Sequence, residues 1–352
     1  MYASIKHVKS SISLVQGVLL ALSLIFAFVG ARATLDNLSK PQFCEKDAAN
    51  DAFVVAKMNH TTHTVTTLAG IQMPRLIYGT AWKKEATADL VTKAILTGFR
   101  GIDTACQPKH YQEAGVGKAL ANIHLQHGIP REDIFLQTKF TSINGQDPHT
   151  IPYDKNAPLP DQVRQSFAVS LRNLQTTYID SIVLHGPYPT HAETLTVWRV
   201  FEEFFDHGQV KQLGISNTYQ LTQLQQLFED ARIKPAVLQN RFHAETGYDS
   251  EIRAFCRRHG IIYQSFWTLS ANPHLLRSHV MKELAEKRGC TAEQLMFRFV
   301  MDLGVAPLTG TTSELHMKQD LAVLDMAPLS AEEIASVEQL MIREYSGHQL
   351  NQ

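Results

Sequence analysis

From Met73 onward, short apolar runs alternate with amphipathic stretches, and this alternation constrains the fold more than any other feature. Eight of the runs have the length and composition of β-strands. Alternation of strands with helical patterns is typical of βαβ units that build a parallel sheet. The predicted strands are Leu76–Tyr78, Phe99–Asp103, Ile134–Lys139, Ile179–His185, Gln209–Ser216, Ala236–Asn240, Ile261–Phe266 and Ala306–Thr309.

Helical patterns lie between these strands, and several have recognisable ends. Thr291, with Gln294 three residues later, is typical of a helix start. Gly98, Gly208, Gly260 and Gly304 each follow a helical pattern, where a left-handed residue commonly ends a helix. An open, doubly wound sheet would also alternate, but the sequence holds no GxGxxG loop. We therefore predict an α/β fold, a (β/α)8 TIM barrel. The helical stretches are Ala88–Leu96, Val163–Leu174, Thr194–Phe205, Leu221–Ala231, Ser250–His259, Ala292–Leu303 and Ser313–Leu321.

Charge and cysteine content exclude some classes of function. The 33 basic and 34 acidic residues give a net charge of -1, so nucleic acid is not an expected partner. The four cysteines are scattered without a CxxC pair, which indicates neither a zinc site nor a redox dithiol. The three that fall within the barrel, Cys106, Cys256 and Cys290, are expected to be small buried hydrophobic residues.

The N-terminal segment differs in kind from the rest. Lys6 and Lys9 precede an uncharged apolar stretch, residues 10–31, so residues 1–33 are predicted to be a signal-anchor or a cleaved signal peptide. The first would place the protein at a membrane through one span, and the second in the secretory pathway. A misassigned start codon, which would leave a cytoplasmic protein, is the third alternative. Residues 34–65 are interpreted as a linker and residues 66–345 as the barrel.

Polar residues end five of the predicted strands. They are Asp103, Lys139, His185, the pair Ser216-Asn217, and Gln239. In a (β/α)8 barrel the active site lies at the C-terminal ends of the strands. Five polar ends converging on one face predict a catalytic site there.

At this point the sequence resembles the aldo/keto reductase family. GFRGIDTA, the Tyr-x-Glu-x-x-Val-Gly of Tyr111–Gly117, IFLQTKF, IDSIVLH, VKQLGISN and KPAVLQN follow one another as in that family. The similarity runs from about Gly70 to Leu340. It implies a nicotinamide cofactor bound without a Rossmann motif and reduction of an aldehyde or ketone, or the reverse reaction.

The resemblance also implies a catalytic tetrad of Asp103, Tyr111, Lys139 and His185. A free tyrosine has a pKa of about 10, and a nearby ammonium group is expected to lower it, which makes Tyr111 a better proton donor. Asp103 would keep Lys139 charged, unless the two form only a structural ion pair. His185 could polarise the substrate carbonyl. The loop departs from the family, because Tyr111 lies eight residues after Asp103 rather than five. His110 is the second candidate for the donor.

Cofactor contacts are implied at the strand ends and beyond the last strand. Leu308 and His316 replace a lysine and an arginine that hold the 2′-phosphate of NADP in many family members. NADP(H) is the cofactor that the family resemblance implies. Because of these two replacements, NAD(H) is kept as an alternative. Lys318 is a candidate cation to bind the 2′-phosphate in their place. The residues implied are Gly79, Thr80, Asp103, Ser216, Asn217, Gln239, Phe266, Thr309, Gly310, Thr311, Gln319 and Asp320.

The substrate is expected to lie among His185, Trp82 and Trp267, although either indole could pack in the barrel wall. The long connection from Thr141 to about Pro160 is a candidate functional loop. The alternative function is a non-catalytic, nicotinamide-binding regulatory barrel attached to a membrane partner. A metal-dependent hydrolase is disfavoured because no HxH motif occurs on a strand, so no metal is predicted.

Overall fold

A computed structural model describes residues 63–349 as a closed barrel of eight parallel strands, in the order β10-β3-β4-β5-β6-β7-β8-β9. The predicted barrel is confirmed. The membrane segment predicted at residues 1–33 and nearly all of the predicted linker lie outside the described residues. The barrel strands are β3 (Ile77–Gly79), β4 (Gly101–Asp103), β5 (Phe135–Phe140), β6 (Ser181–Leu184), β7 (Leu213–Ser216), β8 (Val237–Arg241), β9 (Ile262–Phe266) and β10 (Val305–Thr309).

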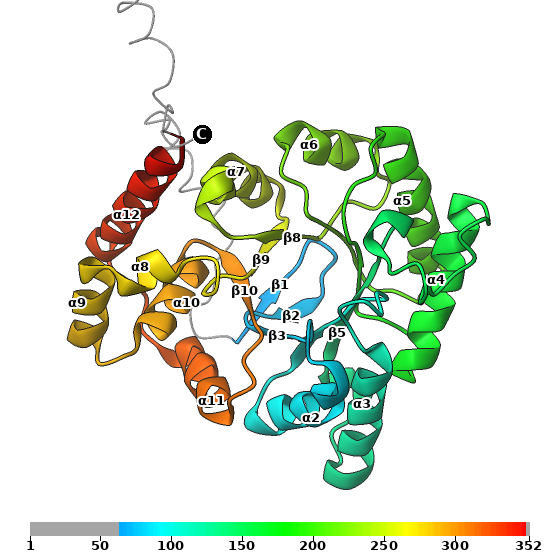
Figure 1. Cartoon of the computed structure of the whole chain (residues 1–352), viewed down its shortest axis with the longest axis horizontal. Helices are drawn as coiled ribbons and strands as arrows, with labels where there is room; N and C mark the ends of the chain where they lie inside the picture. The colour runs from blue at the N-terminus through cyan, green and yellow to red at the C-terminus, as the bar shows by residue number, and fades with distance from the viewer. Residues whose placement is uncertain (1–62, 350–352) are drawn as a thin grey trace, which may run out of the picture. The chain divides into compact units, whose positions relative to one another are not determined.

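Helices ring the outside of the barrel, as Figure 1 shows. All seven predicted helices form, with ends that differ by up to four residues from the prediction. Among the described residues, α3, α8, α9 and α12 are additional to those predicted. The helices are α2 (Thr87–Thr97), α3 (Glu113–His127), α4 (Leu159–Leu174), α5 (His191–Asp206), α6 (Leu221–Asp230), α7 (Ser250–His259), α8 (Pro273–Arg277), α9 (His279–Arg288), α10 (Ala292–Asp302), α11 (Glu314–Ala322) and α12 (Ala331–Gln349).

The helix ends follow local sequence chemistry. Thr291 and Gln294 form the predicted capping box at the start of α10. Gly98, Gly208, Gly260 and Gly304 all have positive φ, which glycine adopts without steric cost. Within residues 63–349 no helix combines the length and the hydropathy that a membrane span requires.

Two apolar clusters hold the barrel. The larger fills the space between the sheet and the helices, and the smaller lies inside the barrel with Ile77, Val183 and Val237. A hairpin of β1 (Thr64–Thr66) and β2 (Gln72–Pro74) places the fully buried Met73 in this inner cluster. The hairpin was not predicted. Cys106 and Cys256 are buried as expected, but Cys290 is only partly buried.

Side chains inside the barrel form layers, because alternate residues of a strand point to the same face. Toward the C-terminal ends of the strands, the apolar layer is followed by a layer of glutamines. The charged and aromatic side chains at the strand ends form the last layer. The triplets that show this order are Phe135, Gln137 and Lys139 on β5, Val237, Gln239 and Arg241 on β8, and Ile262, Gln264 and Phe266 on β9. The strand register therefore carries polar groups to one rim of the barrel.

Candidate active site

A buried ion pair joins Asp103, the last residue of β4, to Lys139 on β5. The Lys139 ammonium donates to both carboxylate oxygens, at 2.7 Å and 2.6 Å, and to the backbone carbonyl of Thr104 at 2.9 Å. The two side chains are 0% and 3% exposed. Burial lowers the pKa of Lys139, and the Asp103 carboxylate opposes that change. The pair predicted at the barrel mouth is present.

Three buried glutamines form a hydrogen-bonded layer beneath Asp103, and two of them donate to its carboxylate. Gln137 and Gln239 each donate from Nε2 to Asp103 Oδ1, at 2.8 Å and 3.0 Å. Both also donate to Gln264 Oε1, at 2.8 Å and 2.9 Å. Asp103 is thus fixed by strands β5 and β8 together with its lysine. Gln137 was not predicted as a site residue, because a glutamine within a strand carries no recognisable signal.

The Tyr111 ring faces both Lys139 and His185. The ammonium of Lys139 lies 5.3 Å from the centre of the phenol ring. The Tyr111 and His185 rings meet edge to face, with 6.1 Å between their centres. Among the described residues, no hydrogen bond is formed by the Tyr111 hydroxyl, so it is available to a ligand. All four residues of the predicted tetrad are therefore brought together.

The direction of the Tyr111 pKa differs from the expectation. Burial raises the pKa of Tyr111, and the Asp103 carboxylate raises it further. The expected lowering is wrong for this state of the protein, because burial of the phenol, together with the Asp103 carboxylate, determines the direction of the pKa. The phenol therefore carries its proton at neutral pH.

His185 follows strand β6 and is held by Thr141, a residue that the sequence identified only as the start of the long loop. His185 Nδ1 lies 2.7 Å from the buried Thr141 hydroxyl. Burial, with a smaller contribution from Lys139, lowers the pKa of His185 to about 3. The imidazole is neutral at physiological pH. If Thr141 donates to Nδ1, the ring proton is on Nε2, which can then donate to a substrate oxygen.

His110, the second candidate for the proton donor, has different neighbours. Its Nδ1 lies 3.0 Å from Gln107 Oε1, and its ring packs against Trp82 at a tilt of 38°, with 3.9 Å between centres. Burial lowers the pKa of His110, as does the neighbouring Lys109. The rebuilt loop thus packs His110 against the rim, while Tyr111 faces Lys139 and His185.

The predicted carboxamide partners lie on neighbouring strand ends. Ser216 Oγ donates to the Gln239 carbonyl at 2.6 Å, and Asn217 Nδ2 donates to the His185 carbonyl at 2.7 Å. Gln239 uses its Nε2 on Asp103 and Gln264, and among the described residues its Oε1 accepts no hydrogen bond. Phe266 ends β9 and is partly exposed. These groups form one wall of the site.

The predicted phosphate and adenine residues lie beyond β10. Thr309 donates to the Asp320 carboxylate at 2.7 Å, and burial raises the pKa of Asp320 to about 6. The backbone carbonyl of Gln319 accepts from Gln294 at 2.9 Å. Lys83 was not predicted, yet its ammonium contacts the carbonyl of Gly310. The position of Lys83 in the sequence, next to Trp82, does not predict a contact with a residue 227 positions away.

The first barrel strand completes this wall. Thr80 is fully buried, and its hydroxyl donates to the Asp103 carbonyl at 2.9 Å. Gly79 lies beside Thr309 of β10, where an added Cβ would make an ordinary contact of 3.5 Å with the Thr309 carbonyl. Leu308, which replaces the lysine that holds the 2′-phosphate in many family members, packs in the inner apolar cluster. Lys318 forms a surface ion pair with Glu314 at 2.8 Å.

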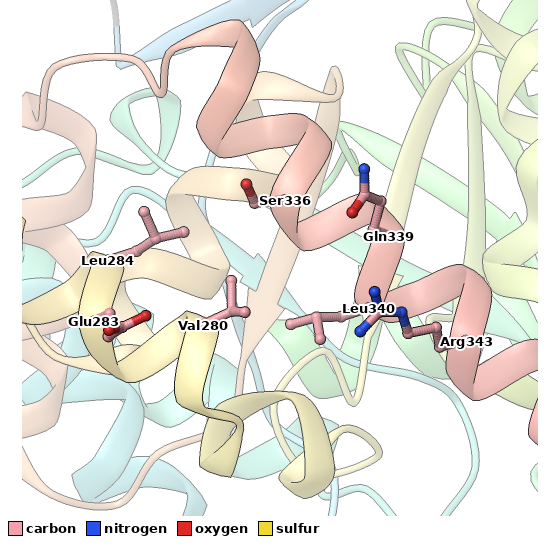
Figure 2. Close-up of a pocket in the computed structure, with 7 residues that line it drawn as sticks. All are labelled: Val280, Glu283, Leu284, Ser336, Gln339, Leu340 and Arg343. Atoms are coloured by element: carbon pink, nitrogen blue, oxygen red, sulfur yellow. The ribbon is translucent and has the colours of Figure 1, made fainter.

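Both predicted substrate indoles are exposed, so neither packs in the barrel wall. Trp82 is 58% exposed and Trp267 is 48% exposed. Both have left-handed backbone angles, φ 63° and φ 56°, which are unusual for a bulky residue. By contrast, a hollow of about 260 Å³ lies away from this chemistry, between α9 and α12 (Figure 2), where Leu284 and Leu340 line it with charged neighbours.

Comparison with known proteins agrees with this geometry. The sequence profile of the Aldo/keto reductase family matches residues 75–342. Glyoxal reductase of Bacillus subtilis is 27% identical over 281 residues, which cover 79% of this chain and 92% of that protein. Methylglyoxal reductase DkgA of Escherichia coli is 28% identical over 274 residues, covering 77% of this chain and 90% of the relative.

Solved structures give the same result. The crystal structure of an aldo/keto reductase from Brucella melitensis superimposes with a TM-score of 0.67 at 26% identity, and the match covers 79% of this chain and 98% of that one. A family match over most of the chain, joined to a closed parallel barrel with the expected tetrad at its rim, decides the assignment. The chain belongs to the aldo/keto reductase family and is an oxidoreductase that acts on carbonyl or alcohol groups.

Proposed function

We propose that this protein reduces an aldehyde or ketone to the alcohol, or catalyses the reverse reaction, with a nicotinamide cofactor and with Tyr111 as the proton donor. One observation carries the proposal. The phenol of Tyr111 lies beside both the buried Lys139–Asp103 pair and a neutral His185 at the rim of the barrel.

The residues of the cofactor wall fit a nicotinamide dinucleotide. Gln239 Oε1 has a free acceptor position for an amide N–H, and Phe266 offers a partly exposed ring face. Lys83 supplies a cation beside the Gly310 backbone. When bound, such a cofactor would supply the hydride.

The chain's own residues account for proton delivery. Tyr111 is protonated at neutral pH and has its hydroxyl available to a substrate oxygen. As negative charge develops on that oxygen, the Lys139 ammonium stabilises it, and Nε2–H of the neutral His185 can donate to it. Asp103, fixed by Gln137 and Gln239, keeps the ammonium in place. His110 is not needed for this path.

We propose NADP(H) as the default cofactor and NAD(H) as the alternative. Lys318, the substitute cation, is occupied by Glu314 on the helix surface. Leu308 cannot pair with a phosphate, and His316 is exposed on α11. A 2′-phosphate therefore has fewer fixed positive partners than the family pattern supplies, which favours use of both cofactors.

Small dicarbonyl compounds and aromatic aldehydes are the substrates that we propose first. The relatives named above are a glyoxal reductase and a methylglyoxal reductase. The exposed indoles Trp82 and Trp267 provide apolar surface for a larger ring.

The test is a carbonyl panel with purified protein, in which the loss of NADPH or NADH is followed by absorbance at saturating and subsaturating cofactor. Methylglyoxal, glyoxal and benzaldehyde should be reduced with at least one cofactor. Bound cofactor without turnover on any carbonyl would overturn the enzyme proposal and favour a binding protein. A tenfold or larger preference for NADH would overturn the NADP(H) default.

Membrane attachment through residues 10–31 is a separate proposal, supported only by the apolar sequence with its basic flank. Fractionation of cells that express the full chain, together with sequencing of the mature N-terminus, tests it. A protein released by high salt with residues 1–33 intact would exclude both the anchor and the cleaved signal.

A further inference from the structure

Arg241 is a cation at the rim of the barrel that forms no ion pair with an acid among the described residues. It is the last residue of β8 and leaves the strand on the same face as Gln239, which contacts Asp103 inside the barrel. Its strand partner in the register is Phe266, the end of β9. Among the ion pairs of the described residues, none includes Arg241. Its positive charge therefore lies one layer above the glutamines, without an ion pair in the part of the chain that the structure describes.

The guanidinium group is held in place by stacking rather than by hydrogen bonds. Its central carbon lies 4.2 Å from the centre of the Trp267 ring, a cation–π distance. Its Nε is buried and has no hydrogen-bond partner among the described residues. A buried donor without an acceptor is costly, so the hydrogen bonds of this guanidinium group are not satisfied by the described residues. Trp267 is 48% exposed, so the stacked pair lies at the open rim.

Among the described residues, no neighbour of Arg241 accepts a hydrogen bond from its Nε. The Tyr219 hydroxyl accepts from the Arg241 backbone N–H at 3.2 Å and donates to Asn217 at 3.2 Å. The nearby Asp249 uses its Oδ2 to accept hydrogen bonds from Asn240 and Tyr263, and its Oδ1 has no partner among the described residues, so neither oxygen bonds to Arg241. The planar fork of a guanidinium group matches a carboxylate or a phosphate, in two parallel hydrogen bonds.

We propose that Arg241, stacked on Trp267, is a binding point for an anionic oxygen group of a ligand in the active site. This inference rests on the proposed function for the identity of the ligands. Two sources present that chemistry at the rim: a carboxylate carried by the carbonyl substrate, and the phosphates of the cofactor. Neither source changes the expectation that the loss of the guanidinium group weakens binding.

The experiment compares Arg241→Gln with wild type, with Arg241→Lys as the variant that keeps charge without the fork. Arg232→Gln is the matched control, since it removes an exposed arginine that pairs with Asp206 away from the rim. Dissociation constants of NADPH and NADH are measured by fluorescence titration. Binding of 4-carboxybenzaldehyde and of benzaldehyde is measured by calorimetry in the absence of reduced cofactor, followed by kcat/KM for both aldehydes. Circular dichroism confirms that each variant is folded.

If the cofactor supplies the anion, Arg241→Gln raises the dissociation constants of both cofactors about 10- to 100-fold, while aldehyde binding is unchanged. If the substrate supplies it, the cofactor constants stay the same and the affinity for 4-carboxybenzaldehyde falls by about the same factor, with benzaldehyde unaffected. Unchanged binding in every titration, as in the Arg232→Gln control, overturns the proposal. Because the titrations need no turnover, a protein that reduces no carbonyl would overturn the proposed function and still report on Arg241.

Discussion

Replacing Lys139 by methionine should destabilise the protein strongly, because it leaves the Asp103 carboxylate buried without its counter-charge. The substitution removes three hydrogen bonds, two to the carboxylate and one to the Thr104 carbonyl. Only the neutral donors Gln137 and Gln239 remain on the carboxylate. Loss of one partner of a buried pair costs about 3–5 kcal/mol, and the side-chain exposures of 0% and 3% place this pair in that class.

The assay is urea denaturation at pH 7, with the free energy of unfolding as the readout. Arg164→Met is the matched control. The Arg164–Glu203 pair is exposed on both sides, so its loss should cost less than about 1 kcal/mol. The double variant Asp103→Asn/Lys139→Met, which removes both charges of this pair, should recover about 2 kcal/mol or more of the single variant's loss.

A Lys139→Met variant that loses less than about 1 kcal/mol would refute this reasoning. The reasoning would fail equally if the single and double variants were equally destabilised, since the buried charge would then not be the cause.

Three further predictions concern His185 and the packing of the barrel. Thr141→Val should move the His185 ring proton away from Nε2 and lower kcat, whereas Thr141→Ser should keep the proton on Nε2 and leave kcat unchanged. The ¹⁵N chemical shifts of the imidazole report which nitrogen carries the proton. Identical shifts in the two variants would contradict the assignment. The pKa of His185 falls to about 3 on folding from an ordinary value near 6.5. As the pH falls below about 6.5, this residue therefore lowers the free energy of unfolding by up to about 1.4 kcal/mol per pH unit. His185→Gln should therefore unfold with a shallower dependence on pH between 6 and 4, and equal slopes would exclude the shift. Gly117→Ala should cost about 1–3 kcal/mol or more in urea denaturation, because its Cβ would lie 2.1 Å from the Asn173 carbonyl, while Gly186→Ala, with its nearest neighbour at 3.9 Å, should change stability far less.

The sequence predicted the barrel because its strands are short, apolar and regularly spaced, which is a local signal. It also located Asp103, Lys139 and His185, since a polar residue that ends an apolar strand must lie on the catalytic rim of a parallel barrel. The helix α3 was not predicted, because its first turn follows the rebuilt loop at Gln107–His110, where the expected spacing is lost.

Features that depend on distant neighbours could not be predicted. Gln137 and Gln264 meet below Asp103 only when the barrel closes, since 127 positions separate them. The charge of Arg241 is informative only because, among the described residues, no acid forms an ion pair with it once the barrel is closed. The direction of the Tyr111 pKa was wrong for the same reason, because burial and Asp103 outweigh the ammonium expected to lower it.

If Tyr111 protonates the substrate oxygen, removal of its hydroxyl should slow turnover without weakening cofactor binding. Wild type and Tyr111→Phe are assayed with methylglyoxal and benzaldehyde under saturating NADPH, and the dissociation constant of NADPH is measured for both. We expect kcat to fall about 10²- to 10⁴-fold in the variant while cofactor affinity is unchanged, because the variant lacks the general acid. A variant that turns over at the wild-type rate would contradict the account, even with the barrel and the cofactor site intact.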